Sequence, residues 1–516
     1  MINSIKINTT MKQKITLLFF VLTSIVVTAQ TVKIGNTSYG SISDAITAAN
    51  ENDVILITGI HTESITLSKS ITLKGTDPST DIIQAAATAV NDGTGNRVIN
   101  ISRAEDTDVL TITIENLGIR NGNADSNTNG GGINVDKVTG LLTLKNLIIE
   151  NNYSDKNGGG LSFAGSNVDV VECTIKNNES ALDGGGIIAT PNNGAGINSV
   201  VNIQQSLISS NNGRNGGGIY INGNNGFGND YIIDVNVENS TVSNNNATSA
   251  SGGTGGGAIW CKVAKWTTNA GGNGTSGNIN LQLVHATVYN NTHAALVKSG
   301  LRFTGTSGFT TNFSAYNSII VSADDVASKV INFTNANLTN MVNCILGGLE
   351  GAATANTLID DATKNNLKGK TATQAGLTGT LTNEGGKTQV LAITDGSNSD
   401  DFCTASTGIS LPTIDQRGAT REGNPDAGAF EFGGTLSLNN VDLFNKLSIY
   451  PNPANNTVSI SGVDEIQKIT IFSLLGKKEV EVSNKNFVNV SQLSNGIYFI
   501  QIEKNNRTYL KKFIKN

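Results

Sequence analysis

One short pattern recurs through the middle of this chain: Asn or Asp, then three glycines, then an alternating apolar strand. It occurs at Asn129–Ile133, Asn157–Leu161, Asp183–Ile187 and Asn215–Ile219, and a looser copy ends at Ile259. Three consecutive glycines suit a turn with positive φ in which neighbouring backbones lie close together. Repeats with a period of roughly 20 to 50 residues indicate an architecture in which similar units stack on one another.

Two further strands with a bend between them follow in each unit. Their inward positions are apolar or small, and the third inward position of each set forms a column: Leu117, Leu147, Cys173, Ser206, Ser240, Ala286, Ser318 and Cys344. The residue before each member of this column is polar: Asn116, Asn146, Glu172, Gln205, Asn239, His285, Asn317 and Asn343. Similar residues at similar positions predict coils that are stacked in register.

No helix-length apolar pattern separates these strands, so each coil must pair with its neighbours as parallel strands. The fold class that follows is all-β, a right-handed parallel β-helix, which is a single-stranded solenoid. We expect about 12 to 14 coils, which at a rise of about 4.8 Å per coil would make a rod of roughly 60 Å.

Composition narrows the class of partner and the kind of site. The chain has 516 residues, 15% of them charged, and a net charge of −6, which argues against nucleic acid as a partner. Its four cysteines are far apart and form no CxxC pair, so a disulfide scaffold or a zinc site is not expected. Cys173 and Cys344 lie in the small inward column and should be buried thiols.

The N-terminus resembles a secretory signal. Lysines precede an apolar run from Ile15 to Val27, and residues 27–29 offer a small-residue cleavage site, which gives a signal peptide over residues 1–29. The apolar run is too short for a confident membrane span, and we expect no transmembrane segment in the mature protein. The β-helix should then cover residues 30–433.

The first coils suggest how the solenoid begins. Ile42 to Ala49 has helical spacing, with Ser41 or Ser43 able to cap it, and a short helix here could cover the open end of the stack. Residues 41–75 resemble the N-terminal coils of pectate-lyase-like β-helix proteins. This resemblance implies a fold and transfers no active site.

A charged stretch closes the β-helix. Ile414 to Phe432 resembles the choice-of-anchor Q signature of bacterial β-helix surface proteins, through these residues: Asp415, Arg417, Gly418, Arg421, Asp426, Gly428, Ala429 and Glu431. Two arginines and three acids so close together favour internal ion pairs in a terminal coil over a catalytic role.

The last part of the chain changes character after a linker over residues 434–445. Residues 446–516 have shorter strands, more Lys and no glycine triplets, and by themselves predict a small antiparallel sandwich of about seven strands. They resemble the C-terminal sorting domain of the type IX secretion system of Bacteroidetes-type bacteria. The residues that carry this sorting motif are Pro451, Asn452, Pro453, Gly496, Ile497, Tyr498, Lys511 and Lys512. The resemblance implies the type IX secretion machinery as a partner, removal of the domain, and release or attachment to surface glycolipid.

Two sets of residues are candidates for ligand binding. Asp125, Asn127, Asn129 and Asp136 have the spacing of a calcium loop around a glycine turn, although the last position is Asp and no flanking helices are visible. Calcium is therefore the one cofactor that the sequence suggests, and turn chemistry explains the same residues.

Trp260 and Trp266 are the only tryptophans, and they lie in the longest interval between repeats. Trp266 could stack on sugar rings, with outward Asn and Thr rows adding hydrogen bonds, whereas Trp260 occupies an inward strand position that suits the core. Adjacent acid pairs such as Asp324-Asp325 do not make a catalytic pair, because neighbouring residues on a strand point to opposite faces. No catalytic residue is predicted.

We therefore expect a secreted or cell-surface protein that acts as a binding or adhesive module for polysaccharides or another surface. A polysaccharide lyase or glycoside hydrolase of pectin-lyase-like fold remains an alternative, because a composite site spanning several coils is invisible in sequence. A passive structural surface protein is the second alternative.

Overall fold

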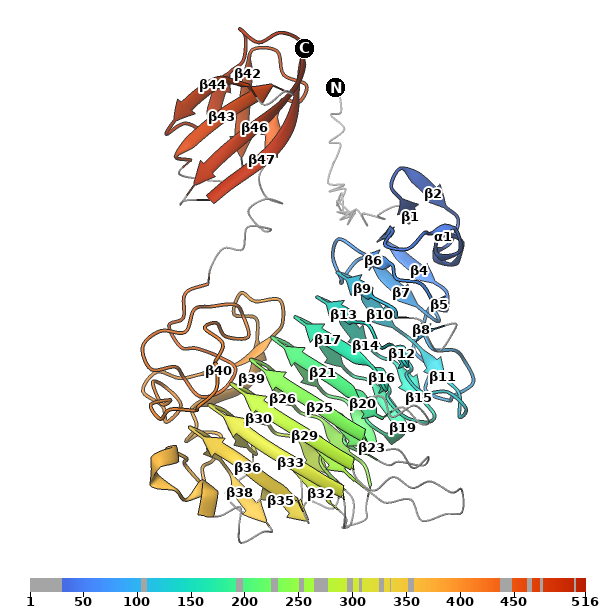
Figure 1. Ribbon diagram of the computed structural model, residues 1–516, viewed down its shortest axis with the longest axis vertical. Helices are drawn as coiled ribbons and strands as arrows, with labels where there is room; N and C mark the ends of the chain where they lie inside the picture. Colours follow the sequence, from blue (N-terminus) through green and yellow to red (C-terminus); the bar gives the residue numbers. More distant parts are fainter. Residues whose placement is uncertain are drawn as a thin grey trace, which may run out of the picture.

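The computed structural model describes residues 30–436 and 448–516, apart from short internal segments: 104–108, 192–197, 224–230, 250–254, 264–276, 295–299, 306–308, 324–328, 335, 351–356, 462–465, 474–476 and 505–506. Long parallel sheets run along one axis and enclose a single apolar core, as the stacked arrows of Figure 1 show. The all-β class and the parallel β-helix are confirmed.

Sheet A has twelve strands, and it is parallel except where β1 and β2 close its N-terminal end. Its strands are β2 (Thr37–Tyr39), β1 (Thr31–Ile34), β3 (Val54–Thr58), β6 (Thr72–Lys74), β9 (Ile112–Glu115), β13 (Leu142–Lys145), β17 (Asn167–Val171), β21 (Ser199–Gln204), β25 (Tyr231–Glu238), β29 (Gly277–Val284), β33 (Phe309–Tyr316) and β36 (Asn337–Val342).

Sheet B follows sheet A in each coil and has ten parallel strands. They are β4 (Ile60–Thr62), β7 (Ile82–Gln84), β10 (Gly118–Arg120), β14 (Ile148–Glu150), β18 (Thr174–Lys176), β22 (Leu207–Ser209), β26 (Thr241–Ser243), β30 (Thr287–Tyr289), β34 (Ile319–Val321) and β37 (Ile345–Leu346).

Two more sheets complete the coil. The short sheet D contains β11 (Asn123–Ala124), β15 (Tyr153–Ser154), β19 (Glu179–Asp183), β23 (Asn212–Asn215), β27 (Asn246–Ala247) and β31 (Thr292–His293). Sheet C contains β5 (Ile65–Leu67), β8 (Ile99–Ser102), β12 (Ile133–Asp136), β16 (Leu161–Ala164), β20 (Ile187–Thr190), β24 (Ile219–Asn222), β28 (Ile259–Lys262), β32 (Leu301–Thr304), β35 (Lys329–Thr334) and β38 (Gly348–Glu350).

The small inward column and the polar residues that precede it in the sequence lie at the bend between sheets A and B. The small inward column is buried throughout, and burial raises the pKa of the Cys173 and Cys344 thiols to about 12. Each polar residue that precedes this column has a positive φ between 44° and 57°. Asn tolerates this left-handed conformation better than most residues, which explains why it dominates the column.

The glycine triplets form the turn from sheet D into sheet C. Gly130, Gly158, Gly184 and Gly216 all have positive φ. A Cβ on Gly131 would lie 2.2 Å from the carbonyl oxygen of Tyr153 in the next coil. Only a residue without a side chain fits so close an approach, and the strand spacing along the solenoid depends on it.

A ladder of buried asparagines lines the bend between sheets B and D: Asn152, Asn178, Asn211, Asn245 and Asn291. The Nδ2 of each of the first four donates to the Oδ1 of the Asn in the following coil, at 2.9 to 3.0 Å, and the Nδ2 of Asn291 donates to the carbonyl oxygens of Val242 and Tyr289. The same oxygens accept backbone N–H groups, so these polar side chains are satisfied inside the solenoid.

The N-terminal end is covered as predicted. Helix α1 (Ile42–Ala48) begins after Ser41, whose side chain accepts a hydrogen bond from the Asp44 N–H. Ile42, Ala45 and Ile46 are buried in the main core. At the other end of the helix, Lys69 Nζ donates to the carbonyl oxygens of residues 46, 47 and 49.

The C-terminal part of the β-helix departs from the prediction. The parallel stack ends at β36, β37 and β38, so ten strands of sheet A run in parallel instead of the expected 12 to 14 coils. After the 3-10 helix η1 (Ala362–Lys364), residues 371–436 leave the stack and lie along the outer face of sheet B, orange in Figure 1. We call these residues the return segment; within it, β39 (Leu377–Thr382) and β40 (Val390–Ile393) pair antiparallel.

Apolar packing and long-range hydrogen bonds attach the return segment to the solenoid. Its apolar residues cover Tyr289, Ile319, Val321 and Ile345 of sheet B. The hydrogen bonds come from side chains and backbone: Thr241 to Gln416 at 2.6 Å, Arg421 to Asn239 at 3.0 Å, Ala429 N to Thr287 at 2.9 Å, and Gly428 N to Asn317 O at 2.8 Å.

The expected ion pairs form within this segment and not in a terminal coil. Arg417 pairs with Asp415 at 2.7 Å and Arg421 with Glu431 at 3.0 Å, all four side chains being almost fully buried. Burial also raises the pKa of Asp426 to about 7, against the lowering effect of two backbone N–H groups that donate to its carboxylate.

The C-terminal residues form seven antiparallel strands around a core of their own, as predicted. The three-stranded sheet contains β41 (Ser448–Tyr450), β42 (Thr457–Ser461) and β45 (Phe487–Asn489). The four-stranded sheet contains β44 (Lys478–Ser483), β43 (Lys468–Ser473), β46 (Gly496–Lys504) and β47 (Arg507–Lys515).

Candidate functional site: an amide groove on sheet A

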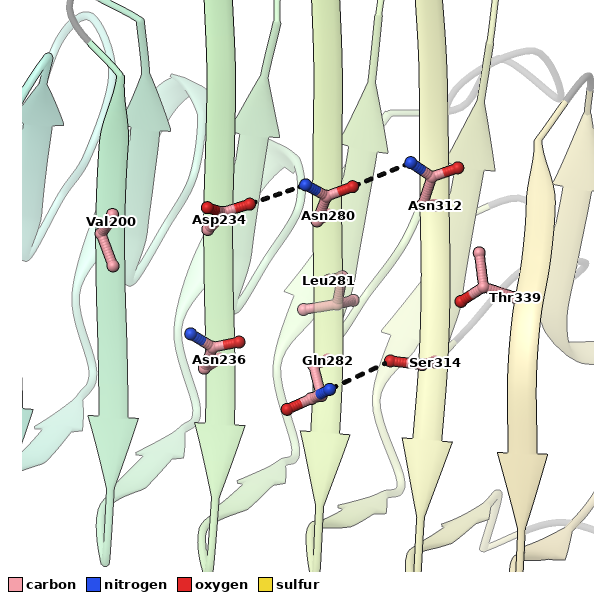
Figure 2. A pocket seen from close by; sticks show the side chains of 9 residues that line it. All are labelled: Val200, Asp234, Asn236, Asn280, Leu281, Gln282, Asn312, Ser314 and Thr339. Atoms are coloured by element: carbon pink, nitrogen blue, oxygen red, sulfur yellow. Dashed lines mark hydrogen bonds between the residues drawn. The ribbon is translucent and has the colours of Figure 1, made fainter. Parts of the chain in front are cut away.

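The outer face of sheet A carries a shallow groove of about 380 Å³ that runs across five strands, from β21 to β36. Figure 2 shows its lining residues: Val200, Asp234, Asn236, Asn280, Leu281, Gln282, Asn312, Ser314 and Thr339. Most of these side chains are amides or hydroxyls. We call this surface the amide groove.

Strand alternation explains why these polar residues share one face. On β29 the core takes Ile279, Leu281 and Leu283, so the intervening side chains point outward. Because the strands pair in register, Asp234, Asn280 and Asn312 stand directly beside one another on β25, β29 and β33. A second row, one pleat further along, contains Asn202, Asn236, Gln282 and Ser314.

Hydrogen bonds link each row into a ladder that starts at a carboxylate. Asn280 Nδ2 donates to Asp234 Oδ1 at 2.7 Å, and Asn312 Nδ2 donates to Asn280 Oδ1 at 2.8 Å, as Figure 2 shows. In the second row, Asn202 donates to Asp169 at 2.8 Å and Asn236 donates to Asn202 at 2.9 Å. Since a carboxylate only accepts, it sets the direction of the amides bonded in series to it, whereas Gln282 further along the second row donates the other way, to Ser314 at 3.5 Å.

The ladders leave hydrogen-bonding capacity on the groove. A side-chain amide has two N–H donors and two acceptor sites, and a ladder bond on each side uses one donor and one acceptor. The second N–H of the Asn280 amide and the second oxygen of Asp234 are therefore not used by the ladder bonds. An array of fixed donors and acceptors at the strand spacing of about 4.8 Å suits a polymer that is rich in hydroxyl groups.

The return segment forms one margin of the groove. Val284, Tyr316 and Val342 continue the outward positions of β29, β33 and β36 beyond the second row. Apolar side chains at 405, 409 and 411 pack against them. Asn343 fixes this contact, because its amide donates to the carbonyl oxygen of Ala405 and accepts from its N–H, at 2.9 and 3.0 Å.

The structure places Trp260 differently from the expectation. Ile259 and Cys261 face the core, so Trp260 lies on the outer face of sheet C, and its expected inward position is wrong. It is nevertheless only 2% exposed, since its ring contacts Tyr220 at 5.2 Å and lies 5.2 Å from the Arg302 guanidinium. Trp266 lies outside the described residues.

The calcium-loop residues are engaged in turn contacts. Asp125 Oδ1 accepts from the Asn127 N–H and the Thr128 hydroxyl, both at 3.0 Å, which is an Asx turn. Asn129 Oδ1 accepts from Asn157 in the next coil. In the parts of the chain that the structure describes, no three His, Cys, Asp or Glu side chains are placed to hold a metal ion.

The predicted sorting residues lie on β46 and β47 of the four-stranded sheet and in the Pro451–Pro453 turn after β41. Asn452, between Pro451 and Pro453, accepts a hydrogen bond from the Ile514 N–H at 2.9 Å. Gly496 and Ile497 begin β46, and Tyr498 stacks on Phe513 with its hydroxyl donating to the Ser494 carbonyl oxygen. Two lysines, Lys511 and Lys512, pair with Ile500 and Phe499 across β46 and β47.

Comparison with known proteins identifies this C-terminal part. Residues 448–516 match the family model of the secretion system C-terminal sorting domain. A search of curated proteins finds no match to the chain. The sorting domain indicates export by the type IX secretion machinery, with the protein attached at the cell surface or secreted outside the cell. No helix among the described residues is long and apolar enough to cross a membrane.

Proposed function

We propose that this exported β-helix is a glycan-binding, adhesive module, and that the amide groove is its binding surface. The observation that carries the proposal is the pair of carboxylate-led amide ladders across β17 to β33. The side chains of these ladders point outward and are half-buried. Their neighbours hold them in place without a ligand, so binding would cost little side-chain entropy.

The spacing of the carboxylates favours binding over glycoside hydrolysis. On the outer face of β17 to β25 they are Asp169, Asp234 and Glu238. Asp169 lies two strands and two residues from each of the others, roughly 12 Å by strand spacing. Asp234 and Glu238 are four residues apart on one strand, roughly 13 Å. Hydrolysis needs two carboxyl groups within about 5 to 9.5 Å of each other.

Our proposal also includes the type of β-helix protein and the route by which it is exported. The likeness of residues 414–432 to the choice-of-anchor Q signature, and of the first coils to pectate-lyase-like proteins, supports a surface β-helix of that general type. A cleaved signal over residues 1–29 and attachment to surface glycolipid through the sorting domain complete the proposed route. Trp266 and calcium at the Asp125 loop are secondary candidates for ligand contact.

A glycan array with the chain from Gln30 to Asn516, run with and without calcium, tests the proposal. We expect saturable binding that Asn280→Ala/Asn312→Ala weakens about tenfold, since each lost hydrogen bond contributes about 0.5 to 1.5 kcal/mol. The matched control is Asn398→Ala, which changes an exposed asparagine of the return segment and should leave binding unaltered.

Three outcomes would redirect the proposal. Binding weakened by Trp266→Ala and not by the groove variant would move the site to the long interval between repeats. New reducing or unsaturated ends on a polysaccharide panel would replace binding by catalysis. The absence of binding to any glycan would favour a passive structural surface protein.

A further inference from the structure

Acidic side chains outnumber basic ones along the outward strand positions of the amide groove and the strands beside it, although Arg421 of the return segment interacts electrostatically with Glu238. Asp169, Asp234 and Glu238 point outward from β17 and β25. At the described outward strand positions of sheet A from β17 to β36, no residue is Lys or Arg. Lysines on this face belong to earlier coils, where Lys74 pairs with Glu115 at 2.6 Å.

We infer that the ligand of the amide groove is a polymer of amino sugars with free, protonated amines. This inference rests on the proposed glycan-binding function and names its ligand class. From β17 to β36 a polyanionic glycan would meet the carboxylates of Asp169 and Asp234 and no lysine or arginine at an outward strand position, so this part of the face disfavours it by like-charge repulsion. A neutral glycan would use the amides and leave the carboxylate charge unpaired.

The geometry assigns different roles to the amides and the carboxylates. Asp234 gives one oxygen to Asn280, so the other remains for an ammonium group. Asp169 is engaged in the same way by Asn202. The two carboxylates are two coils apart along the solenoid axis, with Asn202 on the strand between them. An extended glycan advances by about one ring per strand spacing, so its amines would meet a carboxylate at about every second ring.

The apolar margin supports a sugar over a basic peptide. Sugar rings present C–H edges together with hydroxyl groups, and this margin places Val284 and Tyr316 with the return segment beside the amide rows. The carboxylates are also too far apart, at roughly 12 Å, to share one metal ion. The groove therefore combines hydroxyl recognition, an apolar edge and widely spaced negative charge.

The test compares oligosaccharides of equal length with the chain from Gln30 to Asn516: chitosan oligomers, their N-acetylated forms and cello-oligomers. We expect the chitosan oligomers to bind at least tenfold more tightly than the acetylated ones at low salt. This preference should shrink as salt rises, because partly exposed charges are screened.

The Asp234→Asn variant tests the carboxylate charge separately, because it removes the charge and keeps the shape of the side chain. The amide oxygen of Asn can still accept from Asn280, so the ladder and the melting temperature should be kept. We expect it to weaken chitosan binding about two- to fivefold, the range for an exposed ion pair, and to leave cello-oligomer binding unchanged. Asp395→Asn removes one exposed carboxylate from the return segment and should have no effect.

Each other outcome contradicts a particular statement. Equal or tighter binding of acetylated or cello-oligomers overturns the amino-sugar inference and leaves the glycan-binding function standing. If polylysine binds as tightly as the chitosan oligomers, the groove recognises positive charge without regard to the sugar, which also overturns the inference. The absence of binding to every oligosaccharide contradicts the proposed function itself.

Discussion

At the scale of single residues, asparagine has two different roles in this solenoid. Among the polar residues that precede the small inward column, Asn116 and Asn343 are suited to their positions because the backbone there has positive φ. In the buried ladder, Asn211 matters because its side chain joins three coils. The ladder residues from Asn152 to Asn291 each lie five positions after a member of the small inward column. That constant offset was the sequence signal for the ladder, and our sequence analysis did not use it.

We predict that Asn211→Ala destabilises the β-helix by about 2 to 5 kcal/mol. The change removes bonds to Ile175 O and Asn245, and it leaves the Asn178 amide without its acceptor in a site that water does not reach. Denaturant unfolding measures the loss. The neighbouring Asn212→Ala, at an exposed position, should cost less than about 0.5 kcal/mol, and equal costs would contradict the assigned role.

At the scale of elements, the sequence predicts the coils and not the return segment. Alternation along a strand and a repeated bend are local patterns, so Leu142 and Leu144 reveal their inward face without knowledge of the fold. The return segment has no period. Its position depends on single contacts across long stretches of chain, such as Arg421 with Asn239 and Gln416 with Thr241.

The candidate site was predictable only in part, for the same reason. Outward Asn and Thr rows follow from alternation, and the sequence analysis expected them. Their location on β25, β29 and β33, and the start of each ladder at Asp169 or Asp234, depend on register between coils. The inward column of the sequence indicates this register, but it does not indicate which of the outward side chains form hydrogen bonds with one another.

We predict that docking of the return segment weakens as pH rises through about 7. Burial raises the pKa of Asp426 from 3.8 to about 7, so the docked segment binds a proton more tightly than the undocked one. The contribution of Asp426 to the stability of the docked segment is therefore complete below about pH 4, and it is lost as the pH rises from about 4 to 7. Burial raises the pKa of Glu431 as well, in the same direction.

Hydrogen exchange over residues 371–436 at pH 5.5 and 8.5 measures the effect. We expect faster exchange at the higher pH than the intrinsic chemical rate explains, while β13 to β21 stay unchanged. Asp426→Asn should reduce this pH dependence, and Asp395→Asn should retain it. Identical protection at both values would show that Asp426 is ionised in the docked state.

At the scale of the whole molecule, the solenoid and the sorting domain have separate cores. The main core takes residues from Val32 to Ile359, and the C-terminal core takes residues from Ala454 to Phe513. Folding of one therefore does not require burial of the other. This separation fits a domain whose task is export and whose sequence matches the secretion system C-terminal sorting domain.

We predict that deletion of residues 448–516 leaves the β-helix folded and abolishes its appearance outside the cell. The truncated protein should keep the melting temperature of the solenoid within about 2 °C, because the deletion removes no residue of the main core. Cell fractionation then measures export, with the full chain as the control. Surface exposure of the truncated protein would assign export to another part of the chain.

The contacts of the return segment also constrain the spacing of the coils that it covers. Its contacts with Asn239, Thr287 and Asn317 lie on successive coils, so the distance between those coils must match the spacing of residues 421, 428 and 429. A coil inserted or lost between β25 and β34 would separate these partners by one strand spacing. A coil added between β9 and β18 would change none of them. We therefore expect the solenoid to accept added coils only in its N-terminal half, where the groove and its margin keep their size.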